Sequence, residues 1–385
     1  MKREFEKFMG IESEFEFRNI RYFDSKKGNF KEISLAIKDG KYIKPKSKPQ
    51  GDSPEFILVS GITDLHTHLF HGQDLGVHAD DNLLKNGVTA AVDAGSAGGH
   101  LFAAFRELVI EKSKVKIKAF LNISSIGTTS ILLQGELKTS SYLDHDLAVN
   151  TIREHSDVIL GVKVRASYNV GGENTDIALG ISRRAADTAG VPLMVHLGPP
   201  PSDVDVILEN LGPGDILTHS FTAWNGNTLL EDGKPRKAFE SAVKRGVIID
   251  VGHGAGGFDA TVAKALINYG YLPHSISTDL HSHSIQKVHS LPNVMSKFLA
   301  LGMSLEDVLT CTTITPSGIA GFEESKEEFE VGERATFTIF EIKRGQFNFT
   351  DTHGHDFLGE IQINPVLTLH DGEVISNNLS QNNES

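Results

Sequence analysis

The sequence has little of what marks a secreted or membrane-bound protein. It contains one cysteine, Cys311, so no internal disulfide can form and a reducing compartment suits the chain. The first residues, Met1 to Lys7, lack an apolar core of signal-peptide length, and no later run approaches the length of a membrane span. We therefore expect a cytoplasmic protein with no membrane partner.

Positive charge is also scarce. Lysine and arginine number 37 against 50 aspartates and glutamates, which gives a formal net charge of −13 at pH 7. A chain without an excess of cations cannot neutralise many phosphates, so we do not expect a nucleic-acid partner. The 385 residues are 39% apolar and 23% charged, which is typical of a globular protein with one large domain or two ordinary ones.

From residue 55 onward, short apolar runs alternate with amphipathic stretches of helical length. This alternation indicates βα units and a parallel sheet. The candidate strands are Phe56–Leu65, Val88–Val92, Val115–Leu121, Val158–Val164, Val191–His196, Asp215–Thr218, Val247–Val251 and Ser275–Thr278. Eight strands in about 225 residues predict an α/β protein with a (β/α)8 TIM barrel. A doubly wound open sheet is the structural alternative, and we expect no dinucleotide cofactor.

Strand-like segments flank the predicted barrel at both ends. Phe15–Phe17 and Ile33–Ile37 precede it, and Val366–Leu369 follows it. Because the ends of a compact domain usually lie close together, we expect these segments to form one small β-sandwich domain. The predicted division is 1–54 for the first part of the β-sandwich, 55–325 for the barrel, and 326–385 for the second part with a polar tail.

Histidines recur where predicted barrel strands end, which is where barrel enzymes place their chemistry. His66 and His68 end the first strand, and the two-residue period of a strand points both side chains to one face. His196 and His219 end the fifth and sixth strands, and Asp279 ends the eighth. One such histidine is usually structural, but this recurrence is hard to explain as packing. Neutral imidazoles held together bind transition metals, so we predict a metal site.

Lys163 is an unusual residue for a buried strand, because it lies between Val162 and Val164. An unpaired ammonium group in low dielectric is costly. Either an acidic residue pairs with Lys163 or its stem carries the charge to the surface, or else the amine is converted chemically. Reaction with CO₂ would give a carbamate, which is an anionic ligand able to bridge two metal ions.

These residues and several longer motifs resemble the amidohydrolase superfamily of binuclear metallohydrolases. The nearest group is the dihydroorotase-like amidohydrolase/deacetylase metallohydrolases, and the similarity covers nearly the whole chain. The matching motifs are Gly87–Gly98, Gly161–Arg165, Asp250–Gly256, Ser277–His281, Val294–Met303 and Pro365–Leu369. The resemblance implies a barrel with a β-sandwich built from both chain ends and, as is common among relatives, a homo-oligomer.

The same resemblance implies a cofactor of two divalent metal ions. The implied ligands are His66, His68 and Asp279 for one ion, His196 and His219 for the other, and N6-carboxylated Lys163 as the bridge. Zinc is the expected metal for such nitrogen and oxygen donors, with manganese, iron and cobalt left open. A hydroxide bridging the metals would attack the substrate, and Asp279 would act as the catalytic base that passes the proton to the leaving group.

The expected reaction is hydrolysis of an amide or ester bond, N-acyl or O-acetyl, in a small molecule that bears a carboxylate. A cyclic amidohydrolase of dihydroorotase or hydantoinase type is one alternative. Leu69-Phe70-His71 speaks against it, because such enzymes resemble one another in placing a fixed polar residue after His-x-His-Leu. A phosphotriesterase or lactonase is a second alternative, and a non-catalytic scaffold homologue is a third.

Candidate substrate residues are few. Arg165 should face the same way as Lys163 and could bind a substrate carboxylate, or else form a salt bridge at the barrel rim. His253, in a glycine-rich run, and His283 could also contact substrate, whereas His281 has no assigned role. We interpret the second His-x-His pair, at 353–355, as a surface feature of the terminal region.

Overall fold

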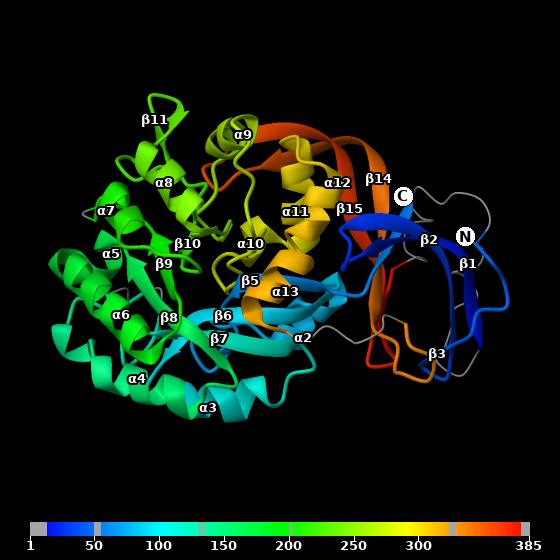
Figure 1. Ribbon diagram of the computed structural model, residues 1–385, viewed down its shortest axis with the longest axis horizontal. Helices are drawn as coiled ribbons and strands as arrows, with labels where there is room; N and C mark the ends of the chain where they lie inside the picture. The colour runs from blue at the N-terminus through cyan, green and yellow to red at the C-terminus, as the bar shows by residue number, and fades with distance from the viewer. Residues whose placement is uncertain are drawn as a thin grey trace.

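In the computed structural model, a parallel sheet of seven strands forms the body of the protein (Figure 1). The structure describes residues 14–49, 55–130, 132–133, 135–200, 202–322 and 329–378. Neighbouring strands follow one another in chain order, as expected for successive βα units. The strands are β5 (Ile62–Thr67), β6 (Val88–Gly98), β7 (Lys116–Asn122), β8 (Ile159–Ala166), β9 (Leu193–Leu197), β10 (Ile216–Thr218) and β13 (Ile248–Ile249).

An eighth segment, residues 275–280, closes this sheet without forming a regular strand. It makes a parallel bridge through Ser275 to Asp250, just beyond β13, and another through Leu280 to Thr67 at the end of β5. The amide of His68 also donates to the carbonyl of Leu280 at 2.9 Å. The predicted TIM barrel is therefore confirmed, with its eighth position held by isolated bridges.

Helices cover the outside of the barrel sheet (Figure 1). The buried side of α6 includes Ala178, Leu179 and Ser182, spaced so that one face of the helix packs inward. The longer helices are α4 (His145–Glu154), α6 (Thr175–Ala189), α8 (Lys237–Arg245), α9 (Ala260–Asn268) and α11 (Leu291–Ala300). The shorter ones are α2 (Ala79–Asn82), α3 (Phe102–Phe105), α5 (Tyr168–Gly171), α7 (Val204–Glu209), α10 (Ile285–Val288), α12 (Leu305–Thr310) and α13 (Ile314–Ala320). Among the described residues, no helix is long and apolar enough to cross a membrane.

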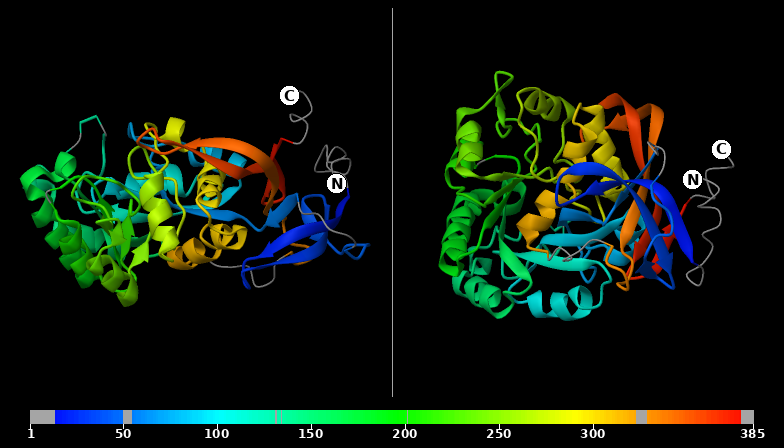
Figure 2. Two further views of the ribbon diagram at one scale, coloured as in Figure 1. Left: turned by 90° about the horizontal axis from the view of Figure 1, so that it is seen from above. Right: turned by 45° about the vertical axis from the view of Figure 1, so that its right-hand side comes forward.

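The two ends of the chain form a second seven-stranded sheet beside the barrel (Figure 2). Its strand order is β16-β15-β14-β4-β1-β2-β3, so strands from both termini meet in one sheet, as predicted. Phe17, Leu58 and Phe337 belong to the apolar core of this sheet. The strands are β1 (Phe15–Asp24), β2 (Asn29–Lys38), β3 (Lys41–Ile43), β4 (Phe56–Val59), β14 (Phe337–Thr350), β15 (Asp356–His370) and β16 (Glu373–Asn377), and β11 (Leu230–Glu231) and β12 (Lys234–Pro235) form a separate hairpin.

The prediction of one strand over 56–65 is wrong. β4 lies in the terminal sheet, antiparallel to β14, and only β5 enters the barrel. The chain changes sheets at Gly61, whose φ of 149° suits glycine and where a Cβ atom would lie 2.2 Å from the hydroxyl of Thr89. The domain limits at 54/55 and 325/326 stay predictions, because residues 50–54 and 323–328 lie outside the described residues, as does most of the predicted polar tail.

The hairpin of β14 and β15 extends from the terminal sheet along the barrel. The amide of Ile363 donates to the hydroxyl of Ser296 on α11 at 2.9 Å. At the hairpin tip, the amide of Thr352 donates to the carbonyl of Phe258 at 3.1 Å. The 353–355 pair therefore lies at the surface, as interpreted, beside the loop that follows β13.

Candidate metal centre

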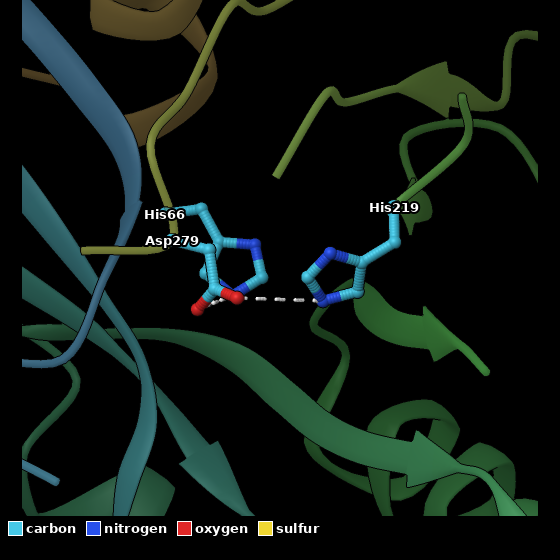
Figure 3. Close-up of side chains that lie close together, drawn as sticks. All are labelled: His66, His219 and Asp279. Atoms are coloured by element: carbon cyan, nitrogen blue, oxygen red, sulfur yellow. Dashed lines mark ion pairs between the residues drawn. The ribbon is translucent and has the colours of Figure 1, made fainter. Parts of the chain in front are cut away.

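Three histidine rings converge on one carboxylate at the carboxyl end of the barrel sheet. Nε2 of His66 lies 3.4 Å from Oδ1 of Asp279, and Nε2 of His68 lies 3.3 Å from the same oxygen. Nε2 of His219 lies 4.0 Å from Oδ2 of Asp279. Figure 3 shows His66 and His219 pointing toward Asp279 from separate elements. All four side chains are buried.

Hydrogen bonds on the outer side of the His66 ring fix its tautomer. Nδ1 of His66 lies 2.7 Å from the hydroxyl of Thr218, and that hydroxyl donates its own hydrogen to Oδ2 of Asp250 at 2.6 Å. Thr218 must therefore accept from Nδ1–H of His66. The lone pair of Nε2 is left facing Asp279.

Hydrogen bonds at Nδ1 also orient the rings of His68 and His219. Nδ1 of His68 lies 2.9 Å from the hydroxyl of Ser96, which donates to Oδ2 of Asp93 at 2.7 Å. Nδ1 of His219 lies 2.6 Å from the carbonyl of Gly252, which can only accept. All three histidines thus present a bare Nε2, the form in which imidazole binds a metal with its other nitrogen hydrogen-bonded behind it.

Lys163 and His196 complete the predicted set. Nζ of Lys163 lies 3.3 Å from Nε2 of His66 and 3.3 Å from the sulfur of Met194. Within the described part of the chain, no carboxylate lies within 4.0 Å of this amine. The ring of His196 packs edge-on against His219, with centroids 4.3 Å apart.

Burial favours the neutral forms of these groups. It lowers the pKa of His68 to about 3 and that of His219 to about 4, and it lowers the pKa values of His66 and His196 well below 6.5. Burial also lowers the pKa of Lys163 to about 7. A neutral amine is the form that reacts with CO₂, so the surroundings of Lys163 favour the predicted conversion.

Glycines let the backbone pass close to the cluster. A Cβ atom on Gly254 would lie 2.3 Å from Oδ2 of Asp279, and one on Gly252 would lie 2.4 Å from the hydroxyl of Thr218. Residues 252–257 also match the spacing of a dinucleotide-binding turn, but these glycines are explained by their contacts with the cluster. His219 and Asp279 adopt positive φ values of 60° and 49°, which is backbone strain of the kind found at functional sites.

Arg165 is already paired. Its Nε and Nη2 atoms donate to the two carboxylate oxygens of Glu136 at 2.7 and 2.8 Å, and both side chains are largely buried. The salt bridge considered as the alternative for Arg165 is therefore present. Glu136 was not singled out in the sequence, because nothing in its local pattern points to Arg165.

The other predicted substrate residues lie in different settings. Both ring nitrogens of His253 are already engaged: its Nδ1 donates to the carbonyl of Gly254 at 3.0 Å and its Nε2 accepts from Nζ of Lys297 at 2.8 Å. His283 is exposed. His281 is buried, and its Nε2 lies 3.9 Å from Oδ2 of Asp279.

The donor set fits a divalent metal ion. One ligand atom from each of His66, His219 and Asp279 can be chosen so that all lie within 4.8 Å of one another. Imidazole nitrogen with carboxylate oxygen is the donor combination of hydrolytic zinc sites. Ser96, Asp93 and Thr218 lie behind these donors and were not predicted, because no periodicity in the sequence reveals them.

Comparison with known proteins agrees with this geometry. No protein-family model matches the chain. A deacetylase of Agrobacterium fabrum is 38% identical over 305 residues, which are 79% of this chain and 75% of that protein. A deacetylase of Brucella anthropi is 39% identical over 299 residues, 77% of this chain and 74% of that one.

Solved structures show the same fold over nearly the whole length. A crystal structure of a dihydroorotase has a TM-score of 0.83 and 33% identity, covering 94% of this chain and 98% of its own. A crystal structure of an adenine deaminase has a TM-score of 0.80 and 28% identity, covering 90% and 96%. The chain therefore belongs to the amidohydrolase/deacetylase family and is a metal-dependent hydrolase.

Proposed function

We propose that the enzyme hydrolyses the N-acyl or O-acetyl bond of a small molecule that bears a carboxylate. The observation that supports this most directly is the convergence of three bare Nε2 atoms on Asp279. Relatives named deacetylases add support for acyl transfer to water. The buried Lys163, without a carboxylate partner in the described residues, favours a binuclear site.

The proposed ligands are His66, His68 and Asp279 for one ion, His196 and His219 for the other, and carboxylated Lys163 as the shared ligand. Two such ions, expected to be zinc, would supply activated water and polarise the scissile carbonyl. Asp279 accepts the proton of the attacking water and delivers it to the leaving nitrogen or oxygen. The hydroxyls of Thr218 and Ser96 hold the rings of His66 and His68 in place during the reaction.

A screen of metal-loaded enzyme tests this proposal. N-acetyl amino acids, O-acetyl hydroxy acids, cyclic ureides, lactones and phosphotriesters would be offered at equal concentration. We expect turnover of the first two classes, with loss of activity on chelation and recovery on adding zinc. Hydrolysis of only lactones or phosphotriesters would contradict the proposal.

A cyclic amidohydrolase is the second candidate, because the dihydroorotase structure is similar over 94% of this chain. The residues after His68 disfavour it. Phe70 is buried against Phe105, with ring centroids 5.0 Å apart, and His71 stacks on His78 outside the centre. Ring opening of dihydroorotate or a hydantoin in the same screen would favour this candidate instead.

Location and assembly belong to the proposal as well. The single cysteine, Cys311, is buried and unpaired with any other cysteine, as suits a cytoplasmic enzyme. A homo-oligomer is proposed from the resemblance to the superfamily. Light scattering of the purified enzyme measures the assembly directly.

A further inference from the structure

His281 has the opposite tautomer to the three converging histidines. The amide of His283 donates a hydrogen bond to Nδ1 of His281 at 3.2 Å. An Nδ1 atom that accepts cannot carry a proton, so the proton of this ring lies on Nε2. His281 is therefore a hydrogen-bond donor on the side facing Asp279, and not a metal ligand.

One hydroxyl fixes His281 relative to Asp279. The amide of His281 donates to the hydroxyl of Ser284 at 2.9 Å, and that hydroxyl donates to the backbone carbonyl of Asp279 at 2.8 Å. The amide of Ser282 adds a bond to the carbonyl of Leu75 at 3.0 Å. Hydrogen bonds thus hold the loop on both sides of His281, and they fix the direction in which its Nε2–H group points.

The Nε2–H group of His281 has no acceptor in the described part of the chain. Its distance of 3.9 Å to Oδ2 of Asp279 is too long for a hydrogen bond. Although Nε2 of His281 lacks a partner, it is not fully enclosed by protein, so water or a ligand can reach it. A reachable, oriented donor beside the proposed acid/base is what a substrate-binding residue provides.

We propose, resting on the proposed function, that His281 binds the carboxylate of the leaving half of the substrate through Nε2–H. Asp279 protonates the leaving atom, and in a 2-acetoxy or 2-acetamido acid the carboxylate is attached to the neighbouring carbon. An Nε2–H group next to Asp279 therefore lies on the side of the substrate that carries the carboxylate. Arg165, the residue first expected to bind this carboxylate, has two of its donors held by Glu136.

The tautomer is tested without catalysis. Nitrogen-15 NMR of enzyme labelled at histidine, with the His281→Gln variant used for assignment, distinguishes a protonated Nε2 from a protonated Nδ1. We expect His281 in the Nε2–H form and His66, His68 and His219 in the Nδ1–H form. An Nδ1–H form for His281 would overturn the proposal whatever the enzyme hydrolyses.

The carboxylate contact is tested with a matched pair of substrates. Isopropyl acetate is 2-acetoxypropanoate with its carboxylate replaced by a methyl group. We expect His281→Phe to lower kcat/KM for 2-acetoxypropanoate by about 10- to 100-fold, mainly through KM, and to lower it much less for isopropyl acetate. The His281→Gln variant keeps an N–H donor and should recover part of the loss.

The outcomes separate the two proposals. Equal losses of kcat/KM on both substrates, with normal zinc content, would contradict the role of His281 and leave the proposed acyl hydrolase activity standing. If the wild-type enzyme hydrolyses neither, the proposed function fails, and lactate binding measured by calorimetry decides the role of His281. Unchanged lactate affinity in both His281→Phe and His281→Gln would then contradict it.

Discussion

The hydroxyl of Thr218 lies 2.7 Å from Nδ1 of His66 and determines which nitrogen of that ring carries the proton. It does so because its own hydrogen is committed to Asp250. A chain of carboxylate, hydroxyl and imidazole repeats at Asp93, Ser96 and His68. The rings of His66 and His68 are thus each oriented by a hydroxyl group whose own hydrogen is donated to a carboxylate.

Replacing Thr218 with valine keeps the shape of the side chain and removes this hydroxyl. Nδ1–H of His66 then loses its acceptor and Asp250 loses a donor. We expect zinc affinity to fall about 10- to 100-fold, because groups behind metal ligands commonly contribute that much. Competition with a chromogenic chelator measures it. Thr218→Ser, which keeps the hydroxyl, is the control, and equal affinity in both variants would contradict the prediction.

Asp279→Asn tests the acid/base assignment. The amide has nearly the same size and can still offer an oxygen to a metal, but it cannot take a proton. We expect metal content to be retained and kcat to fall about 10²- to 10⁴-fold. Metal analysis alongside steady-state kinetics checks both parts. Near-wild-type turnover would exclude the acid/base role.

Carboxylation of Lys163 should depend on pH in a defined direction. The pKa of about 7 means that the neutral amine, which attacks CO₂, increases as pH rises through 7. Enzyme reconstituted with zinc and ¹³C-bicarbonate, at constant dissolved CO₂, should form more carbamate at about pH 8 than at about pH 6. Carbon-13 NMR detects the product. The Lys163→Met variant should give no signal, and a signal in it would place the label elsewhere.

The metal-free enzyme should lose stability in mild acid. The folded pKa values of His68 and His219, about 3 and about 4, lie below the unfolded value of 6.5. Between these values the unfolded chain binds more protons, so the free energy of unfolding falls as pH drops below 6.5. Each histidine should cost about 2 kcal/mol at pH 5 relative to pH 8.

Urea denaturation at several pH values, in the presence of a chelator, measures how steeply the free energy of unfolding depends on pH. The His68→Gln variant removes one titrating group and should show a shallower dependence on pH. Identical slopes for the variant and the wild type would show that His68 titrates normally in the folded protein.

The pair of Arg165 and Glu136 should matter for stability. Glu136→Gln leaves a buried guanidinium without its counter-ion, and breaking such a pair costs roughly 3–5 kcal/mol. The double variant Arg165→Met/Glu136→Leu removes both charges and should be more stable than the single variant. Thermal and urea unfolding give the comparison. A stable Glu136→Gln enzyme with only a raised KM would instead favour the substrate role for Arg165.

The barrel and its strand-end residues could be predicted because both follow from short repeats in the sequence. Apolar runs separated by helical stretches define βα units, and the carboxyl ends of parallel strands share one edge. His66, His196 and Asp279 therefore had to lie near one another once the fold was known. Lys163 stood out because its charge conflicts with a buried strand.

The rest depends on contacts that no local pattern encodes. In the run 56–65, Ser60 and Gly61 separate two apolar stretches, but this short interruption does not reveal that the two stretches belong to different sheets. Glu136 and Arg165 are 29 residues apart, and their pairing is set by the loop after β7. The tautomer of His281 depends on one backbone amide of His283, which only the folded loop brings to Nδ1.

The long hairpin of β14 and β15 has a consequence for how the chain folds during synthesis. Asp351 accepts from the amide of Ala260 at 3.2 Å, so the loop after β13 is completed by residues made about 90 positions later. The barrel can collapse before then, but its glycine-rich loop gains this support only when the C-terminal segment emerges from the ribosome. Contacts so distant in sequence form late and slowly, so truncated chains are expected to accumulate with an incomplete centre.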